Sequence, residues 1–185
     1  KRLFYEKLGQ KYNPERYAGF VQYGMWLLTP RVVREFRGYL DTRERVGAYF
    51  EAIVGSVDLV YADPVLKRLW RKGELGPNRL RKHPYNVDLP EQYKDKDRWL
   101  LLETSLDPKW PWTQKTEIPV FSLARVIGER GEREWLLYAH APVDAREGVQ
   151  ITIPQYKPVT VDVSVRGSFY HLREKDGTME EVGQD

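Results

Sequence analysis

The spacing of apolar residues changes near residue 98, from about one helical turn to every second residue. Between residues 42 and 62, apolar positions recur every three or four residues, which places them on one face of a helix. Residues 149–153 and 159–165 instead alternate strictly between valine or isoleucine and polar neighbours, as in strands with one buried and one exposed face. These patterns predict an α+β fold, with helices in the first half and strands in the second.

The second half contains six segments of strand-like sequence separated by short turns. Closely spaced strands with short turns predict an antiparallel β-sandwich over residues 98–173. The polar residues 174–185 are expected to fray. The six predicted strands are residues 98–104, 118–127, 134–140, 149–153, 159–165 and 168–172.

The first half begins with a helix-capping pattern at residues 13–15, which predicts a turn of helix. The apolar residues 19–28 follow and predict a strand that is buried on both faces. Thr29 and Pro30 then favour the start of a helix that ends at Gly38. Ligands bind at the carboxyl ends of strands in α/β folds, so residues near the end of this strand are candidate contacts.

Two longer helices are predicted next. Asp41 and Thr42 cap the first, while Asp63 and Pro64 begin the second, which Gly73 ends. The first of these helices carries an apolar stripe that we expect to face the core: Val46, Tyr49, Phe50, Ile53, Val57 and Val60.

The periodicity disappears after Gly73, and residues 77–97 are rich in proline and polar side chains. This composition predicts a linker between domains. The chain therefore divides into an α/β helical segment at residues 1–76, the linker at residues 77–97, the sandwich at residues 98–173 and a polar tail at residues 174–185.

Composition narrows the classes of function. The chain has no cysteine, which excludes disulfides and thiolate metal sites, and its three histidines lack the spacing of metal ligands. We therefore expect no metal and no cofactor, and we interpret His83, His140 and His171 as structural or surface residues. No apolar stretch reaches the roughly 18 residues that span a membrane, so we expect no membrane partner. High charge without cysteine favours a thermophilic source, and the location stays open, with an extracellular one slightly favoured.

The net charge of +3 conceals an asymmetry between the halves. Residues 1–98 hold 20 basic and 13 acidic residues, whereas residues 99–185 hold 10 basic and 14 acidic residues. Basic residues lie beside a tyrosine in the loop at residues 78–85, as in some loops that contact phosphates. No recognised nucleic-acid-binding or nucleotide-binding motif accompanies this loop, so nucleic acid is a disfavoured partner.

Two parts of the sequence together carry a resemblance to a known family. The first part is residues 19–26 with residues 31–36, which look like a last barrel strand and its helix. The second part runs from residues 134–140 through Tyr170 and is similar to a terminal sandwich. The chain resembles the C-terminal portion of (β/α)8-barrel glycoside hydrolases with an appended antiparallel β domain. The resemblance implies a carbohydrate ligand and a partial α/β barrel-like N-terminal segment. It also implies that another polypeptide segment or chain completes the barrel.

The resemblance leaves the catalytic residues unknown, because the two carboxylates of such enzymes would lie on earlier barrel strands. It therefore implies that this chain supplies one wall of the sugar site, with Trp26 against a pyranose ring and Gln22 and Tyr23 hydrogen-bonded to hydroxyl groups. Aromatic residues on an apolar strand also commonly belong to the core, so both interpretations stay open. Trp110 and Trp112, in a proline-rich loop, either line a glycan surface or pack between domains.

The leading hypothesis is thus a part of a glycoside hydrolase that contributes one wall of the sugar site and a supporting β-sandwich. Whether the chain is itself an enzyme stays open. The alternative is a non-catalytic module that binds glycans or a protein partner.

Overall fold

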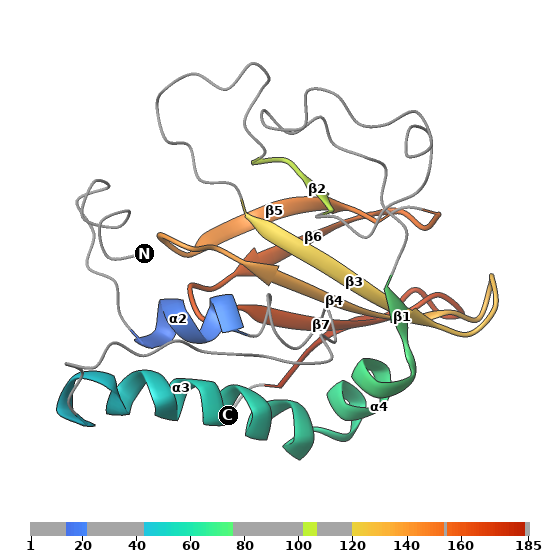
Figure 1. The fold of residues 1–185 in the computed structure, drawn as a ribbon. Coiled ribbons are helices and arrows are strands. Elements are labelled where there is room, and N and C mark those ends of the chain that lie inside the picture. The colour runs from blue at the N-terminus through green and yellow to red at the C-terminus, as the bar shows by residue number, and fades with distance from the viewer. Residues whose placement is uncertain (1–13, 22–42, 76–101, 107–119, 154, 184–185) are drawn as a thin grey trace, which may run out of the picture.

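The structure is a computed structural model that describes residues 14–21, 43–75, 102–106, 120–153 and 155–183. These residues form a mixed α+β fold with a helical layer and two antiparallel sheets (Figure 1). The helices are α2 (Pro14–Val21), α3 (Arg43–Ala62) and α4 (Pro64–Lys72). The strands are β1 (Glu74–Leu75), β2 (Glu103–Thr104), β3 (Phe121–Ile127), β4 (Glu134–His140), β5 (Arg146–Thr152), β6 (Pro158–Val163), β7 (Ser168–Arg173) and β8 (Met179–Val182).

The larger sheet has five strands in the order β1-β3-β4-β7-β8, and the smaller sheet has three in the order β2-β5-β6. All neighbouring strands are antiparallel. Each of the six predicted strands overlaps an observed strand. Burial alternates along β5 and β6, as their period of two predicts, whereas β3, β4 and β7 are buried on both faces. Within the described residues, no helix is long and apolar enough to cross a membrane.

The two sheets share one hydrophobic core. Val149 and Ile151 of β5 are buried in it, whereas Gln150 between them is exposed, as the alternating sequence predicts. Trp135 and Leu137 of β4 contribute to the same core from the larger sheet. Two antiparallel sheets joined by a common core are consistent with the predicted sandwich.

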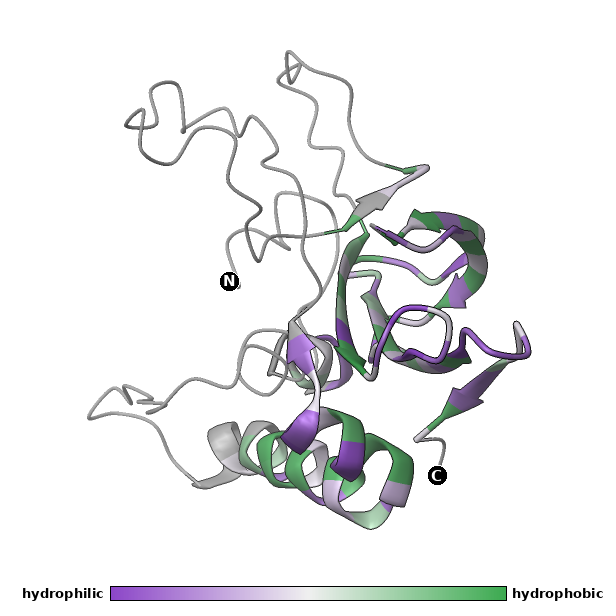
Figure 2. Cartoon of the chain, turned by 90° about the vertical axis from the view of Figure 1, so that its right-hand side faces the viewer, coloured by the Kyte–Doolittle hydropathy of each residue, from purple (hydrophilic) through white to green (hydrophobic). Residues whose placement is uncertain are grey.

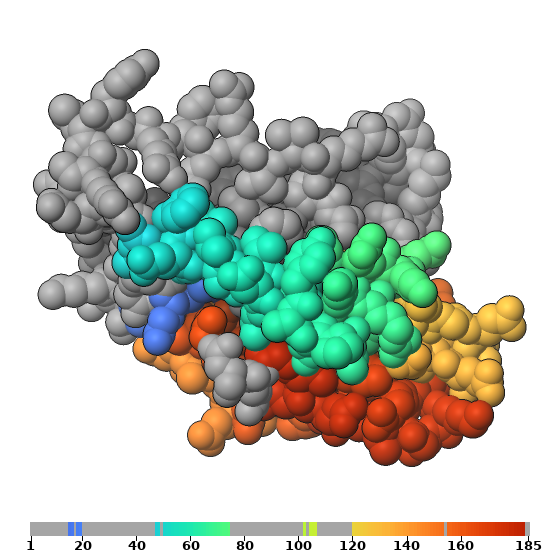
Figure 3. Space-filling model, turned by 90° about the horizontal axis from the view of Figure 1, so that it is seen from below, coloured from blue at the N-terminus to red at the C-terminus, as the bar shows by residue number. Residues whose placement is uncertain are grey.

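The helices α3 and α4 cover the other side of the larger sheet (Figures 1 and 2). Leu66 and Leu69 of α4 are buried against Leu123, Leu136 and further sheet residues in a second hydrophobic cluster. From below, α3 and α4 lie beside the C-terminal strands (Figure 3). The molecule therefore has three layers, which are helices, the larger sheet and the smaller sheet.

Asp63 fixes the start of α4, as its position before a proline predicts. Its carboxylate accepts hydrogen bonds from the backbone N–H groups of Val65 and Leu66 at 2.7 and 3.1 Å. The other oxygen of Asp63 accepts from the N–H of Gly183 at 3.0 Å. One side chain thus caps a helix and ties the end of β8 to the helical layer.

The strand predicted for residues 19–28 is wrong at its first three residues, because Gly19, Phe20 and Val21 belong to α2. A short apolar run suits a buried strand and a buried helix equally, and here the helix that begins at Pro14 continues through it. The buried Ala18 and Gly19 are small, which lets the helix backbone lie close to the larger sheet. Residues 22–28, the predicted helix to Gly38 and the predicted linker at residues 77–97 lie outside the described residues.

The expectation that the tail after Arg173 frays is also wrong. Residues 179–182 form β8, which pairs with β7 along its whole length. Its sequence, Met-Glu-Glu-Val, lacks the alternation of β5 and β6. Besides the ladder with β7, Glu180 binds His171 and Arg173, and Val182 packs against the second hydrophobic cluster.

The apolar stripe predicted on α3 is buried only in part. Val60 is buried and Ile53 and Val57 are half-buried, but Phe50 is 51% exposed. The buried side of α3 includes Ser56, whose hydroxyl donates to the carbonyl of Ala52 at 2.8 Å. The hydroxyl satisfies its hydrogen bond within the helix, so a polar residue can occupy the buried face.

Candidate functional site

The five predicted sugar-contact residues, Gln22, Tyr23, Trp26, Trp110 and Trp112, all lie outside the residues that the structure describes. Their contacts therefore stay predictions. The first three nevertheless follow directly on α2, whose last residue is Val21. A chain extends at most about 3.6 Å per residue, so the Cα atom of Trp26 lies within about 18 Å of that of Val21. The position of α2 thus limits where these side chains can lie.

The helix α2 is fixed to the larger sheet by a set of contacts that we call the α2 anchor, formed by Arg16, Gly19, Tyr138, His140 and Val143. The hydroxyl of Tyr138, on β4, donates to the carbonyl of Gly19 at 2.6 Å. The Nε and Nη2 atoms of Arg16 donate to the carbonyl of Val143 at 3.1 and 2.8 Å. These bonds hold α2 at two points over the end of β4.

In the α2 anchor, the ring of His140 packs against Gly19 of α2. The same ring lies beside those of Phe121 and Tyr138, each 6.5 Å away between centroids. His140 is 2% exposed, and its Nε2 atom has no hydrogen-bond partner within the part of the chain that the structure describes. Burial lowers the pKa of His140 to about 4, although a hydrogen bond with the backbone of Val165 opposes this shift. The ring is therefore neutral at pH 7.

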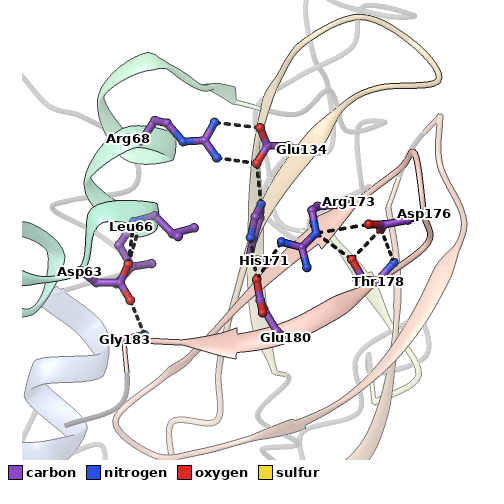
Figure 4. A network of polar contacts seen from close by, with 11 residues as sticks. Asp63, Leu66, Arg68, Glu134, His171, Arg173, Asp176, Thr178, Glu180 and Gly183 are labelled. Carbon is purple, nitrogen blue, oxygen red and sulfur yellow. Dashed lines mark hydrogen bonds and ion pairs between the residues drawn. The ribbon is translucent and has the colours of Figure 1, made fainter.

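A second group of polar residues links α4 to β4, β7 and β8 (Figure 4). We call it the polar bridge, and its members are Arg68, Glu134, His171, Glu180 and Arg173. Arg68 donates to both carboxylate oxygens of Glu134, at 2.8 Å for the Nη1–Oε1 contact. Nε2 of His171 lies 2.7 Å from Glu134, and its Nδ1 lies 3.2 Å from Glu180. Arg173 completes the bridge with an ion pair to Glu180 at 3.2 Å.

The polar bridge is suited to support rather than to catalysis. The hydrogen bonds from Arg68, followed by those from His171, lower the pKa of Glu134 to about 2. A carboxylate stabilised in this way is a weak proton acceptor near neutral pH. The imidazole of His171 lies between Glu134 and Glu180 and contacts both. The two carboxylates are therefore not placed to bind a substrate together. Among the described residues, no group of histidine and acidic side chains is placed to hold a metal ion.

Acid is expected to weaken the polar bridge through Glu134. Its pKa is lower in the folded chain than the ordinary 4.5, so the unfolded chain takes up the proton more readily. The stabilisation is therefore complete above about pH 4.5 and is lost as the pH falls towards 2. The side chain of Glu134 is 29% exposed, and solvent screening limits the effect to about 1–2 kcal/mol.

Urea unfolding of the wild type and of Glu134→Gln, at pH 7 and at about pH 2.5, measures this effect. The free-energy difference between the two proteins should be largest at pH 7 and should shrink in acid. Glu147→Gln is the matched control, because Glu147 is exposed on β5. A difference for Glu134→Gln that is the same at both pH values would contradict the role assigned to its charge.

Another ion pair joins Arg133, which precedes β4, to Glu174, which follows β7. Nε of Arg133 donates to Glu174 at 2.7 Å, and its guanidinium lies 5.0 Å from the ring of Trp135. The indole of Trp135 stacks on Tyr156 at 6.0 Å between centroids. Arg133 and Trp135 are both buried, so this stack belongs to the core and leaves no open aromatic face of Trp135 for a sugar.

No pattern in the sequence predicts the α2 anchor or the polar bridge. The sequence predicts that His140 and His171 are structural or surface residues, and both are buried. Glu134 and His171 lie on neighbouring strands, where Glu134 pairs with Arg173 and His171 with Leu136. Without the register of the two strands, their distance along the chain hides this proximity.

Comparison with known proteins assigns no identity to this arrangement. No protein-family profile, no curated protein and no solved structure matches the chain.

Proposed function

We propose that this chain is part of a carbohydrate-active glycoside hydrolase, in which the residues after α2 form one wall of the sugar site. The observation that carries the proposal is the α2 anchor. Tyr138 and Arg16 bind α2 to the larger sheet, so Gln22, Tyr23 and Trp26 continue from a fixed point. A rigid attachment of this kind suits side chains that must hold a sugar in a defined orientation.

The layers of the fold support the same proposal. The helices α3 and α4 lie on one face of the larger sheet, so the helical segment contacts the antiparallel β domain directly (Figure 1). The second sheet covers the opposite face through the shared core. We propose that these two sheets are the β-sandwich of the resembled family, and that residues 1–76 include the end of its barrel.

The catalytic carboxylates of the proposed enzyme lie on another segment or chain. Glycoside hydrolases place two carboxyl groups across the glycosidic bond, about 5 to 10 Å apart. Glu134 and Glu180 are unsuited to this role, because each binds His171 and an arginine. The chain thus contributes substrate contacts and support, with carbohydrate as its ligand.

Tryptophan fluorescence during titration with a panel of soluble oligosaccharides tests the proposal. We expect at least one oligosaccharide to shift the emission of the full chain and Trp26→Ala to lose most of this response. The matched control is Trp70→Ala on α4, where Trp70 packs edge-on against Tyr61 at 5.6 Å and should not contact sugar. Circular dichroism of both variants verifies their fold. A response that survives Trp26→Ala unchanged would contradict the proposed wall.

A second candidate function is a non-catalytic module that binds a protein, and one observation favours it. Phe50, Val54 and Tyr61 are large apolar side chains that are exposed on α3. Their spacing places them within about 40° of one another around the helix.

In the alternative in which the module binds glycans instead, Trp110 and Trp112 provide the aromatic surface. Loss of the oligosaccharide response in Trp110→Ala or Trp112→Ala, but not in Trp26→Ala, would support that alternative.

A further inference from the structure

The α2 anchor contains a feature that sugar binding does not require. Nε2 of His140 is buried and finds no hydrogen-bond partner among the described residues, although ring nitrogens in protein interiors usually have one. The backbone of α2 covers this atom. A Cβ atom added at Gly19 would lie 2.5 Å from Nε2, 2.6 Å from Cδ2 of the same ring and 2.8 Å from the carbonyl of Arg166. The helix therefore seals the edge of the imidazole that carries Nε2.

The surroundings of Nε2 favour the neutral imidazole over the protonated imidazolium. A proton on Nε2 would need an acceptor or water, and this buried atom has no hydrogen-bond partner among the described residues. The neighbouring hydroxyl of Tyr138 is already directed at the carbonyl of Gly19. Protonation of Nε2 would thus create a buried charge directly beneath α2.

Charged groups on the surrounding segments do not offset this charge. The described charged residues of α2 are Glu15 and Arg16, and Arg16 is directed at the carbonyl of Val143. The turn after β6 carries Arg166, and the connection from β4 to β5 carries Asp144, followed by Arg146 at the start of β5. The lowered pKa of His140 arises from burial, with no contribution from any of these groups.

We propose that His140 is an acid-sensitive latch, which releases α2 from the larger sheet when its Nε2 atom takes up a proton. Release of α2 exposes Nε2 to water, which hydrates the charge. The two sheets and α4 stay assembled, because the described buried residues of their two hydrophobic clusters come from the strands, from α4 and from the loops between them rather than from α2. The proposal is independent of sugar binding, since the docking of α2 is itself the readout.

The direction of the effect follows from linkage. In the docked state the pKa of His140 is about 4, whereas an imidazole in water has its ordinary value of 6.5. Between these values the released state binds more protons, so docking weakens as the pH falls. The full difference corresponds to at most about 300-fold in the docking equilibrium. At pH 4.5 the expected loss is up to about 100-fold.

Hydrogen exchange of the full chain, followed by mass spectrometry and corrected for intrinsic exchange rates, measures this release. Between pH 7 and pH 4.5 we expect amides in α2 to lose up to about 100-fold in protection, while amides in β4 and β7 keep theirs. His140→Gln carries an uncharged amide and should abolish this pH dependence. Glu15→Gln is the matched control for the carboxyl group on α2 and should leave the pH dependence unchanged.

NMR titration of the wild-type His140 ring provides a second measurement that does not depend on the folding of a variant. The ring should gain its proton over the same pH range in which the α2 amides lose protection. Equal protection of α2 at both pH values would overturn the latch. So would a joint loss of protection in α2, β4 and β7, or a pH dependence that persists in His140→Gln.

Discussion

Leu69→Ala is expected to lower the free energy of unfolding by about 2–5 kcal/mol. Leu69 is 0% exposed and belongs to the cluster that joins α4 to the larger sheet. Truncation removes buried apolar surface and leaves a cavity that the rigid sheet fills only in part. Urea unfolding monitored by far-ultraviolet circular dichroism and by tryptophan fluorescence measures the loss.

Val54→Ala on α3 provides the control, because Val54 is 40% exposed and its truncation should change stability by less than about 0.5 kcal/mol. The two spectroscopic signals should have the same midpoint, since helices and sheet share a core. A loss below about 1 kcal/mol for Leu69→Ala would show that α4 does not pack on the sheet as described.

Gly19→Ala is expected to cost about 1–3 kcal/mol, because the added methyl group would overlap the ring of His140. Helix propensity alone predicts the opposite sign, since alanine favours a helix over glycine by about 1 kcal/mol. The neighbouring atoms decide the outcome. Nε2 of His140 would be 2.5 Å and the backbone carbonyl of Arg166 2.8 Å from the new Cβ atom.

Gly55→Ala on α3 is the matched control, because a Cβ atom added there meets nothing within 4 Å. That substitution should stabilise the protein by about 0.5–1 kcal/mol. Thermal unfolding of both variants gives the comparison directly. If Gly19→Ala stabilised the protein as much as Gly55→Ala does, the close approach of α2 to His140 would be refuted.

The sequence predicted those elements whose signal is local. Alternation of valines with polar residues located β5 and β6, and Asp63 followed by proline located the start of α4. The apolar run at Gly19 predicts a strand, but Gly19 lies in α2, because a short apolar run is compatible with either structure. The side of a helix or strand that becomes buried depends on the surface it meets, which explains the exposure of Phe50.

The polar contacts were beyond prediction for a different reason. Glu180 of β8 contacts His171 and Arg173 of β7. The sequence of β8 has no alternating apolar pattern that would predict a strand. The pairing of Arg68 with Glu134 depends on how α4 crosses the sheet, over a separation of 66 residues. The sugar-contact residues Gln22, Tyr23 and Trp26 stay predictions from the sequence.

A crystal structure of the full chain with a bound oligosaccharide tests the proposed sugar wall most directly. We expect a pyranose ring in van der Waals contact with the indole of Trp26, beside the carboxyl end of α2. Hydrogen bonds from its hydroxyl groups should reach Gln22 or Tyr23. A sugar held only by Trp110 and Trp112, or seated on the exposed face of the smaller sheet, would contradict it.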